Sequence, residues 1–204
     1  MSVKPIFFAL DGKHLDNFSR ELEILKGNIY GVKVGLEMFT SEGPSSVEKL
    51  KKDGWTVFLD LKLHDIPNTV QAAAISAGNI GADYLTIHIA SGKEALLAAK
   101  ESKPENLKLL GVSTALTSKA YSPEISQRVY EEFLLAKESK IDGVICPPSE
   151  LFKTKELFEL IVTPGIRLKN DDSHDQKNIT TPEKAIRDGA SYLVMGRSIR
   201  QNIN

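Results

Sequence analysis

The amino-acid sequence predicts a closed barrel of eight parallel strands surrounded by helices, the (β/α)8 or TIM-barrel fold. Short apolar, β-branched segments alternate with amphipathic helical segments, and eight of the apolar segments can be counted. Each apolar segment is hydrophobic almost throughout, as expected for a parallel sheet buried on both faces. An open doubly wound sheet is the alternative. It is disfavoured because no Gly-x-Gly-x-x-Gly follows the first strand and because the count reaches eight.

The expected elements follow one another with short connections. The predicted strands are residues 6–10, 30–35, 57–62, 84–89, 108–114, 143–147, 160–166 and 192–196. The predicted helices are residues 14–27, 45–53, 69–80, 92–102, 123–139, 149–157 and 182–188. Polar residues that can cap a helix start stand at Ser91, Ser122 and Thr181. Gly27, Gly81 and Gly189 stand where helices are expected to end.

Length and composition restrict the possible classes of protein. A chain of 204 residues can bury a substantial core, and we expect one domain spanning residues 1–204. The formal net charge of −1 gives no reason to expect a nucleic-acid partner or an anionic membrane. No apolar run approaches the roughly 20 residues of a membrane span, and the first residues do not resemble a signal peptide, so a cytoplasmic protein is expected. The single cysteine, Cys146, excludes an internal disulfide and a cysteine-cluster metal site.

Charged and polar residues recur where the predicted strands end, which is where a barrel enzyme places its active site. Asp60 and Lys62 directly follow a buried apolar run, and alternation along a strand makes their side chains point the same way. Pro67 then ends the strand and favours a helix start. The other strand-end positions are Asp11, Lys33, His88, Ser113, Thr114, Thr117, Thr163, Arg167 and Arg197.

Charges at the end of a buried strand are costly unless they are paired. We therefore expect Lys33, Asp60, Lys62 and Asp65 to converge into one cluster. Each also has a purely structural interpretation, since Asp60 and Lys62 could form an ion pair that only closes the barrel end and Lys33 could be solvent-exposed. Asp11, directly before a glycine, could be a turn or helix-capping residue.

The last third of the chain has the features of a phosphate site. Arg167 and Arg197 follow the seventh and eighth strands, where barrel enzymes commonly bind phosphate, and Gly165 and Gly196 permit close approach of the backbone. A phosphorylated small molecule is therefore the expected ligand. Residues 169–178 form a long polar segment that is either a solvated connection or a lid over the ligand.

The histidines do not point to a metal site. His88 is flanked by isoleucines and is expected to be a satisfied core histidine rather than a base. His14, His64 and His174 lack the spacing of metal ligands. No metal is expected.

Residues 60–70, DLKLHDIPNTV, resemble the signature of the orotidine 5′-phosphate decarboxylase family. The resemblance runs nearly end to end, because further segments match in the same order: residues 9–11, 32–35, 116–118, 162–167, 175–176, 181–182 and 196–197. Metal-dependent sugar-phosphate decarboxylases and hexulose-phosphate synthases of the same barrel group share the Asp-x-Lys-x-x-Asp pattern. They carry an acid, a Mg²⁺ ligand, where this chain has Lys33, so the lysine favours the orotidylate branch.

This resemblance implies decarboxylation of orotidine 5′-phosphate to uridine 5′-phosphate (UMP) in pyrimidine biosynthesis, with no cofactor. It implies that Lys62 stabilises and protonates a carbanion at C6, that Asp60 lies near the substrate carboxylate, and that Lys33 hydrogen-bonds the ribose and Asp60. It also implies a homodimer in which Asp65 and Ile66 reach into the partner's site. The implied substrate-binding residues are Asp11, Ile66, Thr69, Thr117, Pro164, Arg167, Gln176, Gly196 and Arg197.

Two other functions stay open at this point. One is a metal-dependent sugar-phosphate decarboxylase or hexulose-phosphate synthase, and the other is a non-catalytic nucleotide-binding barrel. The chain also departs from the family pattern, with Leu168 where a proline is usual and Ser198 after Arg197 in a similar situation. Little chain remains after Arg197 for a full closing helix.

Overall fold

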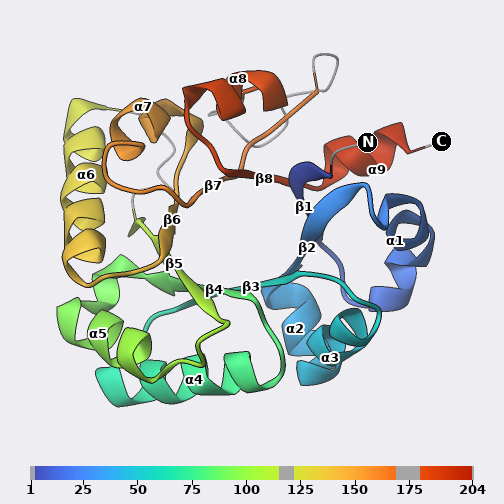
Figure 1. The fold of residues 1–204 in the computed structure, drawn as a ribbon, viewed down its shortest axis with the longest axis horizontal. Helices are drawn as coiled ribbons and strands as arrows, with labels where there is room; N and C mark the ends of the chain where they lie inside the picture. The colour runs from blue at the N-terminus through green and yellow to red at the C-terminus, as the bar shows by residue number, and fades with distance from the viewer. Residues whose placement is uncertain (1–2, 115–121, 169–179, 204) are drawn as a thin grey trace.

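The chain folds as a closed barrel of eight parallel strands (Figure 1). The computed structural model describes residues 3–114, 122–168 and 180–203. Each strand pairs with its neighbours in chain order, and β8 closes the ring by pairing with β1. The strands are β1 (Lys4–Leu10), β2 (Ile29–Gly35), β3 (Val57–Leu63), β4 (Tyr84–His88), β5 (Lys108–Val112), β6 (Gly143–Ile145), β7 (Ile161–Thr163) and β8 (Tyr192–Met195). The predicted (β/α)8 fold is confirmed.

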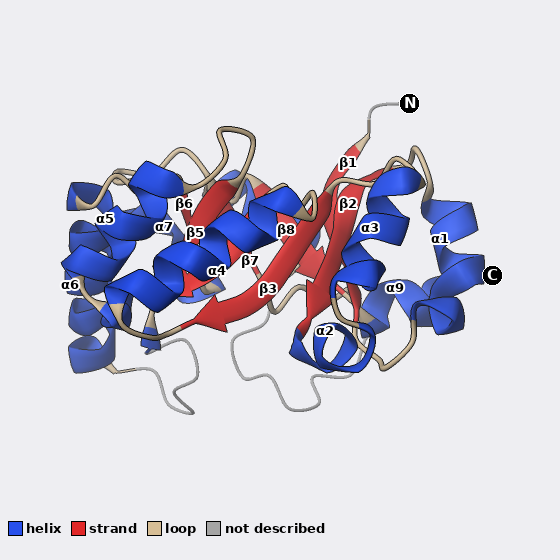
Figure 2. Cartoon of the chain, turned by 90° about the horizontal axis from the view of Figure 1, so that it is seen from below, coloured by secondary structure: helices blue, strands red, loops and turns tan. Residues whose placement is uncertain are grey.

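The helices surround the barrel on its outer side (Figures 1 and 2). They are α1 (Ser19–Leu25), α2 (Leu36–Glu42), α3 (Pro44–Lys52), α4 (Pro67–Asn79), α5 (Lys93–Ser102), α6 (Pro123–Glu138), α7 (Leu151–Thr154), α8 (Pro182–Asp188) and α9 (Arg197–Asn202). Short 3₁₀ turns precede α1 and α7, at Leu15–Phe18 and Pro148–Glu150. The single helices expected at residues 14–27 and 149–157 are therefore each divided into a 3₁₀ turn and a shorter α-helix.

Two helices were not expected from the sequence. α2 begins directly after β2 and is separated from α3 by Gly43, whose φ of 63° breaks the helical path. α9 uses the few residues after β8. Several strands are also shorter than predicted; β7, for example, ends at Thr163 because Pro164 cannot donate to the ladder.

Two of the three predicted capping residues are confirmed by hydrogen bonds. Ser122 Oγ accepts from the Ile125 N–H (3.3 Å), and Thr181 Oγ1 accepts from the Lys184 N–H (3.4 Å). Gly27, Gly81 and Gly189 all have positive φ, as expected where helices end. The prediction for Ser91 was wrong: it lies in a 3₁₀ turn, Ile89–Ser91, and its hydroxyl donates to the Leu63 carbonyl (3.4 Å).

The core has two parts, and alternating side chains of each strand are divided between them. Phe8 and Leu59 belong to the larger part, which also contains buried residues of the surrounding helices. Phe7 and Phe58 belong to the smaller part, which is made of residues in or beside the strands and fills the barrel interior. Because the interior is filled by side chains, ligand can enter only at an end of the barrel.

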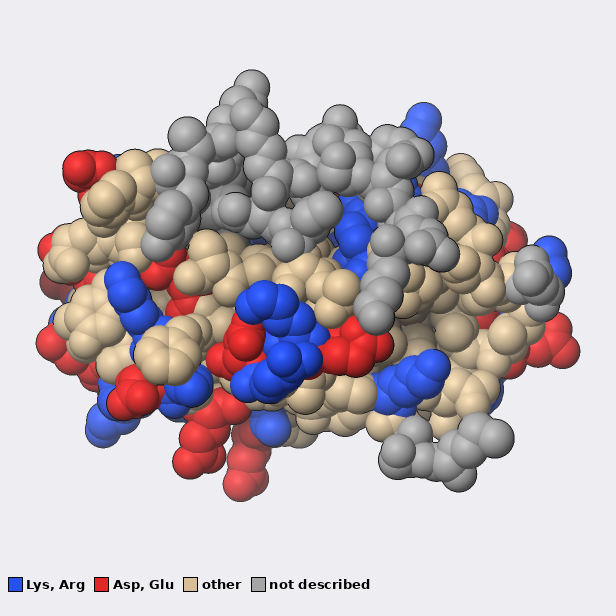
Figure 3. All heavy atoms as spheres, turned by 90° about the horizontal axis from the view of Figure 1, so that it is seen from above, with Lys and Arg blue, Asp and Glu red and all other residues tan. Residues whose placement is uncertain are grey.

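The described residues contain no helix that could span a membrane, and one face of the molecule carries charges of both signs. Among the described residues, no helix combines the length and the apolar character needed to cross a membrane. On the face shown in Figure 3, lysine and arginine side chains lie beside aspartate and glutamate side chains. The cytoplasmic location and the absence of a nucleic-acid partner stay predictions.

Candidate active site

A cavity of about 380 Å³ opens at the carboxyl ends of the strands. Every strand, or the residues directly after it, contributes to the lining. The volume lies within the range of small-molecule sites, roughly 300–1,000 Å³. Charged residues line one part of this cavity and apolar residues another.

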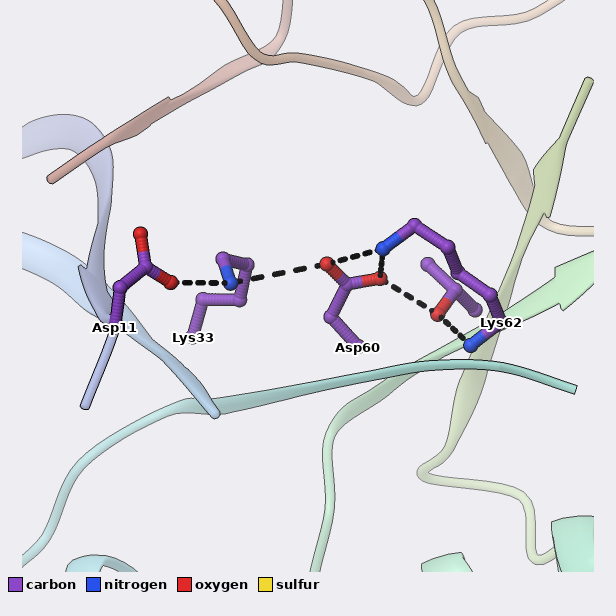
Figure 4. A network of polar contacts seen from close by, with 5 residues as sticks. Asp11, Lys33, Asp60 and Lys62 are labelled. Carbon is purple, nitrogen blue, oxygen red and sulfur yellow. Dashed lines mark hydrogen bonds and ion pairs between the residues drawn. The ribbon is translucent and has the colours of Figure 1, made fainter. Parts of the chain in front are cut away.

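The charged part is a row of four side chains with alternating signs (Figure 4). Lys33 Nζ lies 3.2 Å from Asp11 Oδ1 and 3.7 Å from Asp60 Oδ2. Lys62 Nζ donates to both oxygens of Asp60, at 2.8 and 2.9 Å. The row Asp11–Lys33–Asp60–Lys62 therefore contains two carboxylates and two ammonium groups in mutual contact, as predicted for Lys33, Asp60 and Lys62.

The register of adjacent strands brings these residues together. Ala9 pairs with Lys33, and Gly35 pairs with Asp60, so Lys33 lies two residues before the level of Asp11 and Asp60 and its long side chain reaches both carboxylates. The absence of a side chain at Gly35 gives Lys33 its position, since a Cβ there would lie 3.2 Å from Lys33 Nζ. Lys33 is buried, and the two neighbouring carboxylates are its ion-pair partners.

Asp60 is held in its ionised form by its neighbours. Burial on its own would raise the pKa of this carboxyl, but the charges of Lys33 and Lys62 and hydrogen bonds from Lys62 and Thr86 together lower the pKa below 3.8. Asp60 is therefore an anion at neutral pH. A carboxylate fixed between two cations beside a cavity can act on a substrate through its charge.

Two arginines line the cavity after β7 and β8. Arg167 is buried, and its Nη1 donates to the Ile166 carbonyl (2.9 Å). Arg197 is the first residue of α9. An isolated bridge joins Ile166 to Thr180, with hydrogen bonds from the Arg167 N–H to the Thr180 carbonyl and from the Thr180 N–H to the Gly165 carbonyl. The backbone that carries Arg167 is thus fixed on both sides.

The charges lining the cavity favour an anionic ligand. Four cationic side chains and two anionic ones belong to the lining, which leaves an excess of two positive charges. A phosphate monoester carries about −1.5 to −2 at pH 7 and would balance that excess. The arginines can bind its oxygens in a bidentate manner.

The opposite part of the cavity is apolar and was not predicted residue by residue. Phe58, Val112, Ile145 and Val194 line it. Their sequence signal is weak, because inward-facing apolar residues of a barrel look the same whether they fill the core or touch a ligand. Their position predicts that a flat apolar ring face would bind against them.

His88 also lines the cavity, so its assignment to the core was incomplete. Its ring lies 5.5 Å from that of His64, and among the described residues no partner is found for its buried Nδ1. Burial, followed by the charge of His64, lowers the pKa of His88 below 6.5. The imidazole is therefore neutral at pH 7.

The remaining predicted site residues differ in their position relative to the cavity. Pro164 and Gly196 line the cavity, whereas Thr69 is exposed outside it. Thr117 and Gln176 lie outside the described residues.

Asp65 does not join the charged cluster of its own chain, which corrects that part of the prediction. It is exposed, and its Oδ1 accepts from the Ile66 N–H (2.7 Å). Ile66 is exposed as well. Both follow β3 immediately, in the turn before α4, and this turn directs them away from the cavity lining.

Comparisons with known proteins agree with this geometry. The profile of the orotidine 5′-phosphate decarboxylase / HUMPS family matches residues 4–204. Proteins named orotidine 5′-phosphate decarboxylase from Fusobacterium nucleatum and Oenococcus oeni are 40% and 42% identical to the chain, covering 98% and 97% of it and 91% and 92% of the relatives. The crystal structure of orotidine 5′-phosphate decarboxylase from Lactobacillus acidophilus superposes with a TM-score of 0.77 at 32% identity, covering 95% of this chain and 90% of that one. The chain belongs to the orotidine 5′-phosphate decarboxylase / HUMPS family.

Proposed function

We propose that this chain converts orotidine 5′-phosphate to UMP and CO₂ without a cofactor. The observation that carries the proposal is the Asp60 carboxylate, held between the Lys33 and Lys62 ammonium groups at the edge of a cavity that also contains two arginines. The relatives' names supply the reaction, and the row of charges supplies a way to perform it.

The chemical difficulty of this reaction is the electron pair left on C6. When the bond from C6 to the carboxylate breaks and CO₂ leaves, that pair lies in the plane of the pyrimidine ring and no adjacent carbonyl can delocalise it. Stabilisation must come from a fixed positive charge. We assign this role to Lys62, whose Nζ then transfers a proton to C6 and is reprotonated from solvent.

Asp60 is assigned the role of destabilising the bound substrate relative to the transition state. A substrate carboxylate placed at Lys62 would lie close to the Asp60 carboxylate, and the repulsion would be relieved as CO₂ leaves. Because Lys62 already contacts both Asp60 oxygens, its ammonium group is oriented before the substrate arrives. This arrangement lowers the reorganisation needed in the transition state.

The rest of the substrate would be held by groups around this centre. Arg167 and Arg197 are assigned to the phosphate, and Asp11 with Lys33 to the ribose hydroxyls. Pro164 and Gly196 are assigned to substrate contact because they line the cavity. Thr69 is assigned to substrate contact from the sequence pattern alone. Thr117 and Gln176 have the same assignment from the sequence and lie outside the described residues. Binding the remote phosphate can provide the free energy that orients the reacting centre.

A metal-dependent sugar-phosphate enzyme is the main rival. Such an enzyme needs acids that converge on a cation, and in this chain the ammonium group of Lys33 already lies between Asp11 and Asp60. A non-catalytic nucleotide-binding barrel is a second rival, but a binder needs the arginines and not the row of carboxylates and lysines.

The active form is proposed to be a homodimer of single-domain subunits, each domain spanning residues 1–204. Ile66 and Leu36 are large apolar side chains that are 66% and 55% exposed. They follow β3 and β2, at the end of the barrel where the cavity opens. Covering them with a second subunit would bring Asp65 and Ile66 to the partner's site.

The deciding experiment is an absorbance assay of orotidylate consumption by the purified chain, with and without EDTA. We expect turnover that EDTA does not change. Loss of turnover on chelation would favour the metal-dependent rival. UMP binding without any turnover would favour the non-catalytic rival.

A further inference from the structure

The pairing between β3 and β4 is interrupted at the catalytic lysine. Leu59 pairs with Leu85 and Leu63 pairs with Ile87, so three residues of β3 lie opposite the single residue Thr86. Such a bulge removes ladder hydrogen bonds and redirects side chains. The interruption contains Asp60 and Lys62.

The Thr86 side chain replaces the missing ladder contacts. Its Oγ1 accepts from the Lys62 backbone N–H (2.8 Å) and donates to Asp60 Oδ1 (2.9 Å). A threonine hydroxyl has one proton, and neither an N–H donor nor a carboxylate acceptor allows the opposite direction. The hydrogen-bond order is therefore fixed, from Lys62 N–H to Thr86 and from Thr86 to Asp60.

The Thr86 hydroxyl binds the backbone of Lys62, which has a strained conformation. Lys62 has a φ of 51°, in the left-handed region that costs a residue with a Cβ about 1–2 kcal/mol. Strained conformations of this kind persist where surrounding contacts hold them. Thr86 is fully buried, so water cannot take over the hydrogen bond to the Lys62 N–H.

We propose that Thr86 is a positioning residue for the decarboxylation, because one buried hydroxyl fixes both the backbone of Lys62 and the carboxylate of Asp60. This inference rests on the proposed function. Thr86 does not belong to the cavity lining, so it acts on the reaction only through those two residues. Its loss affects the rate of the chemical step more than the affinity for ligand.

The test compares Thr86→Val, Thr86→Ser and wild type. Valine keeps the branched shape and removes the hydroxyl, so we expect kcat to fall about 10- to 100-fold, as for a displaced catalytic group, while KM and the Kd for UMP stay within about threefold. Serine keeps the hydroxyl and should restore kcat to within about threefold of wild type. Thr86→Ala replaces the valine variant if valine prevents folding.

Thr154→Val is the matched control. Thr154 is also buried, and its hydroxyl donates to the Glu150 carbonyl (2.8 Å), but it lies in α7 and outside the cavity lining. Its kcat should be unchanged. A kcat of Thr86→Val equal to that of Thr154→Val would overturn the inference, as would a serine variant as slow as the valine variant.

A second readout does not depend on activity. Removing a donor to a carboxylate raises its pKa, so a ¹³C NMR titration should show a higher Asp60 pKa in Thr86→Val and little change in Thr86→Ser. An unchanged Asp60 titration in Thr86→Val would contradict the positioning role. A wild-type chain that does not consume orotidylate would instead refute the proposed function, and the titration would still test the contact.

Discussion

Lys62 is held by two sets of hydrogen bonds, one from its side chain and one from its backbone. Its Nζ contacts both oxygens of Asp60, and its N–H donates to Thr86. The side chain is also 37% exposed, so the ammonium group can meet a ligand without first losing a complete shell of protein contacts. A charge that is held in place and still accessible is suited to electrostatic catalysis.

Replacing Lys62 by alanine should separate catalysis from binding. We expect Lys62→Ala to lower kcat by about 10³-fold or more, because the proposed mechanism assigns to Lys62 both the charge beside C6 and the proton donor. The Kd for UMP should change little, since Arg167 and Arg197, the residues assigned to the phosphate, are unaltered. Steady-state kinetics and calorimetric titration with UMP measure the two quantities.

Lys93→Ala is the control for that variant. Lys93 is an exposed lysine paired with Glu138 on the outer helices, so its loss should leave kcat and Kd unchanged. A Lys62→Ala enzyme with a nearly normal rate would remove Lys62 from the mechanism.

The charge of Asp60 should make a pH-dependent contribution to stability. Its folded-state pKa is lowered from 3.8, so its stabilising effect is present above that pH and is lost as pH falls through the lowered folded-state value. At pH 7, Asp60→Asn leaves two lysines without their common anion, and we expect a loss of about 2 kcal/mol in the free energy of unfolding. Urea unfolding of both proteins between pH 7 and pH 3 measures the difference, which should shrink below about pH 4. A difference that stays constant down to pH 3 would contradict the pairing of Asp60.

At the residue scale, the sequence was sufficient to identify the charged residues of the candidate site, but it did not identify Thr86. Charges at the end of a buried strand are anomalous, so Asp60 and Lys62 could be recognised without a structure. A threonine inside an apolar strand is ordinary, because β-branched residues favour strands wherever they lie. Only the bulge in β3 places Thr86 opposite Asp60 and Lys62, and no local pattern in the sequence predicts that bulge.

At the scale of elements, three even-numbered strands are each preceded by a residue that fixes the start of the strand before it. Asp83 precedes β4 and accepts from the Val57 N–H of β3 (2.7 Å). Asp142 precedes β6 and accepts from the Leu109 N–H of β5 (2.9 Å), and Ser191 precedes β8 and accepts from the Ile161 N–H of β7 (3.0 Å). These contacts close the end of the barrel opposite the cavity and set the register of neighbouring strands.

Asp83→Ala should therefore reduce stability without changing the catalytic centre. Asp83 also accepts two hydrogen bonds from Lys51, at 2.9 and 2.7 Å, so its loss leaves both a strand N–H and a lysine without their partner. We expect the free energy of unfolding to fall by about 2 kcal/mol, with kcat unchanged. Chemical denaturation and the orotidylate assay measure the two effects.

Asp188→Ala provides the comparison. Asp188 pairs with Lys184 one helical turn away on the surface of α8, and such exposed pairs contribute about 0.5 kcal/mol or less. Equal stability losses in the two variants would show that Asp83 contributes no more than a surface ion pair.

Prediction of the elements was best where hydrophobic pattern and turn residues agreed. All eight strands were recognised, because each forms a short apolar run between turn signals. α2 was missed because it begins directly after β2, without a connection that would separate the two patterns. The 3₁₀ turns before α1 and α7 could not be distinguished from helix, since both have the same composition.

On the scale of the whole molecule, the segment from Asp60 to Ile66 faces in two directions. Asp60 and Lys62 point into the cavity of their own barrel, whereas Asp65 and Ile66 are exposed beyond it. If a partner subunit covers the exposed residues, each site contains groups from two chains. The resemblance of residues 60–70 to the family signature predicts that the segment serves two sites in this way.

Mixing two inactive variants tests directly whether each active site contains residues of both subunits. Lys62→Ala removes a group from the subunit's own site, and Asp65→Ala removes one from the partner's site. In a mixed dimer, one site then lacks both groups and the other has both. Each variant alone should be inactive, and after subunit exchange about a quarter of the wild-type activity per site should return, because half of the dimers are mixed and each has one intact site.

The control for this experiment is a mixture of Lys62→Ala with Asp60→Asn. Both changes affect the subunit's own site, so each site of every dimer retains a defect and no activity should return. Recovery in the first mixture but not in the second would require a dimer with shared sites. Equal inactivity of both mixtures, with subunit exchange demonstrated by mass spectrometry of the intact dimers, would place Asp65 outside the partner's site.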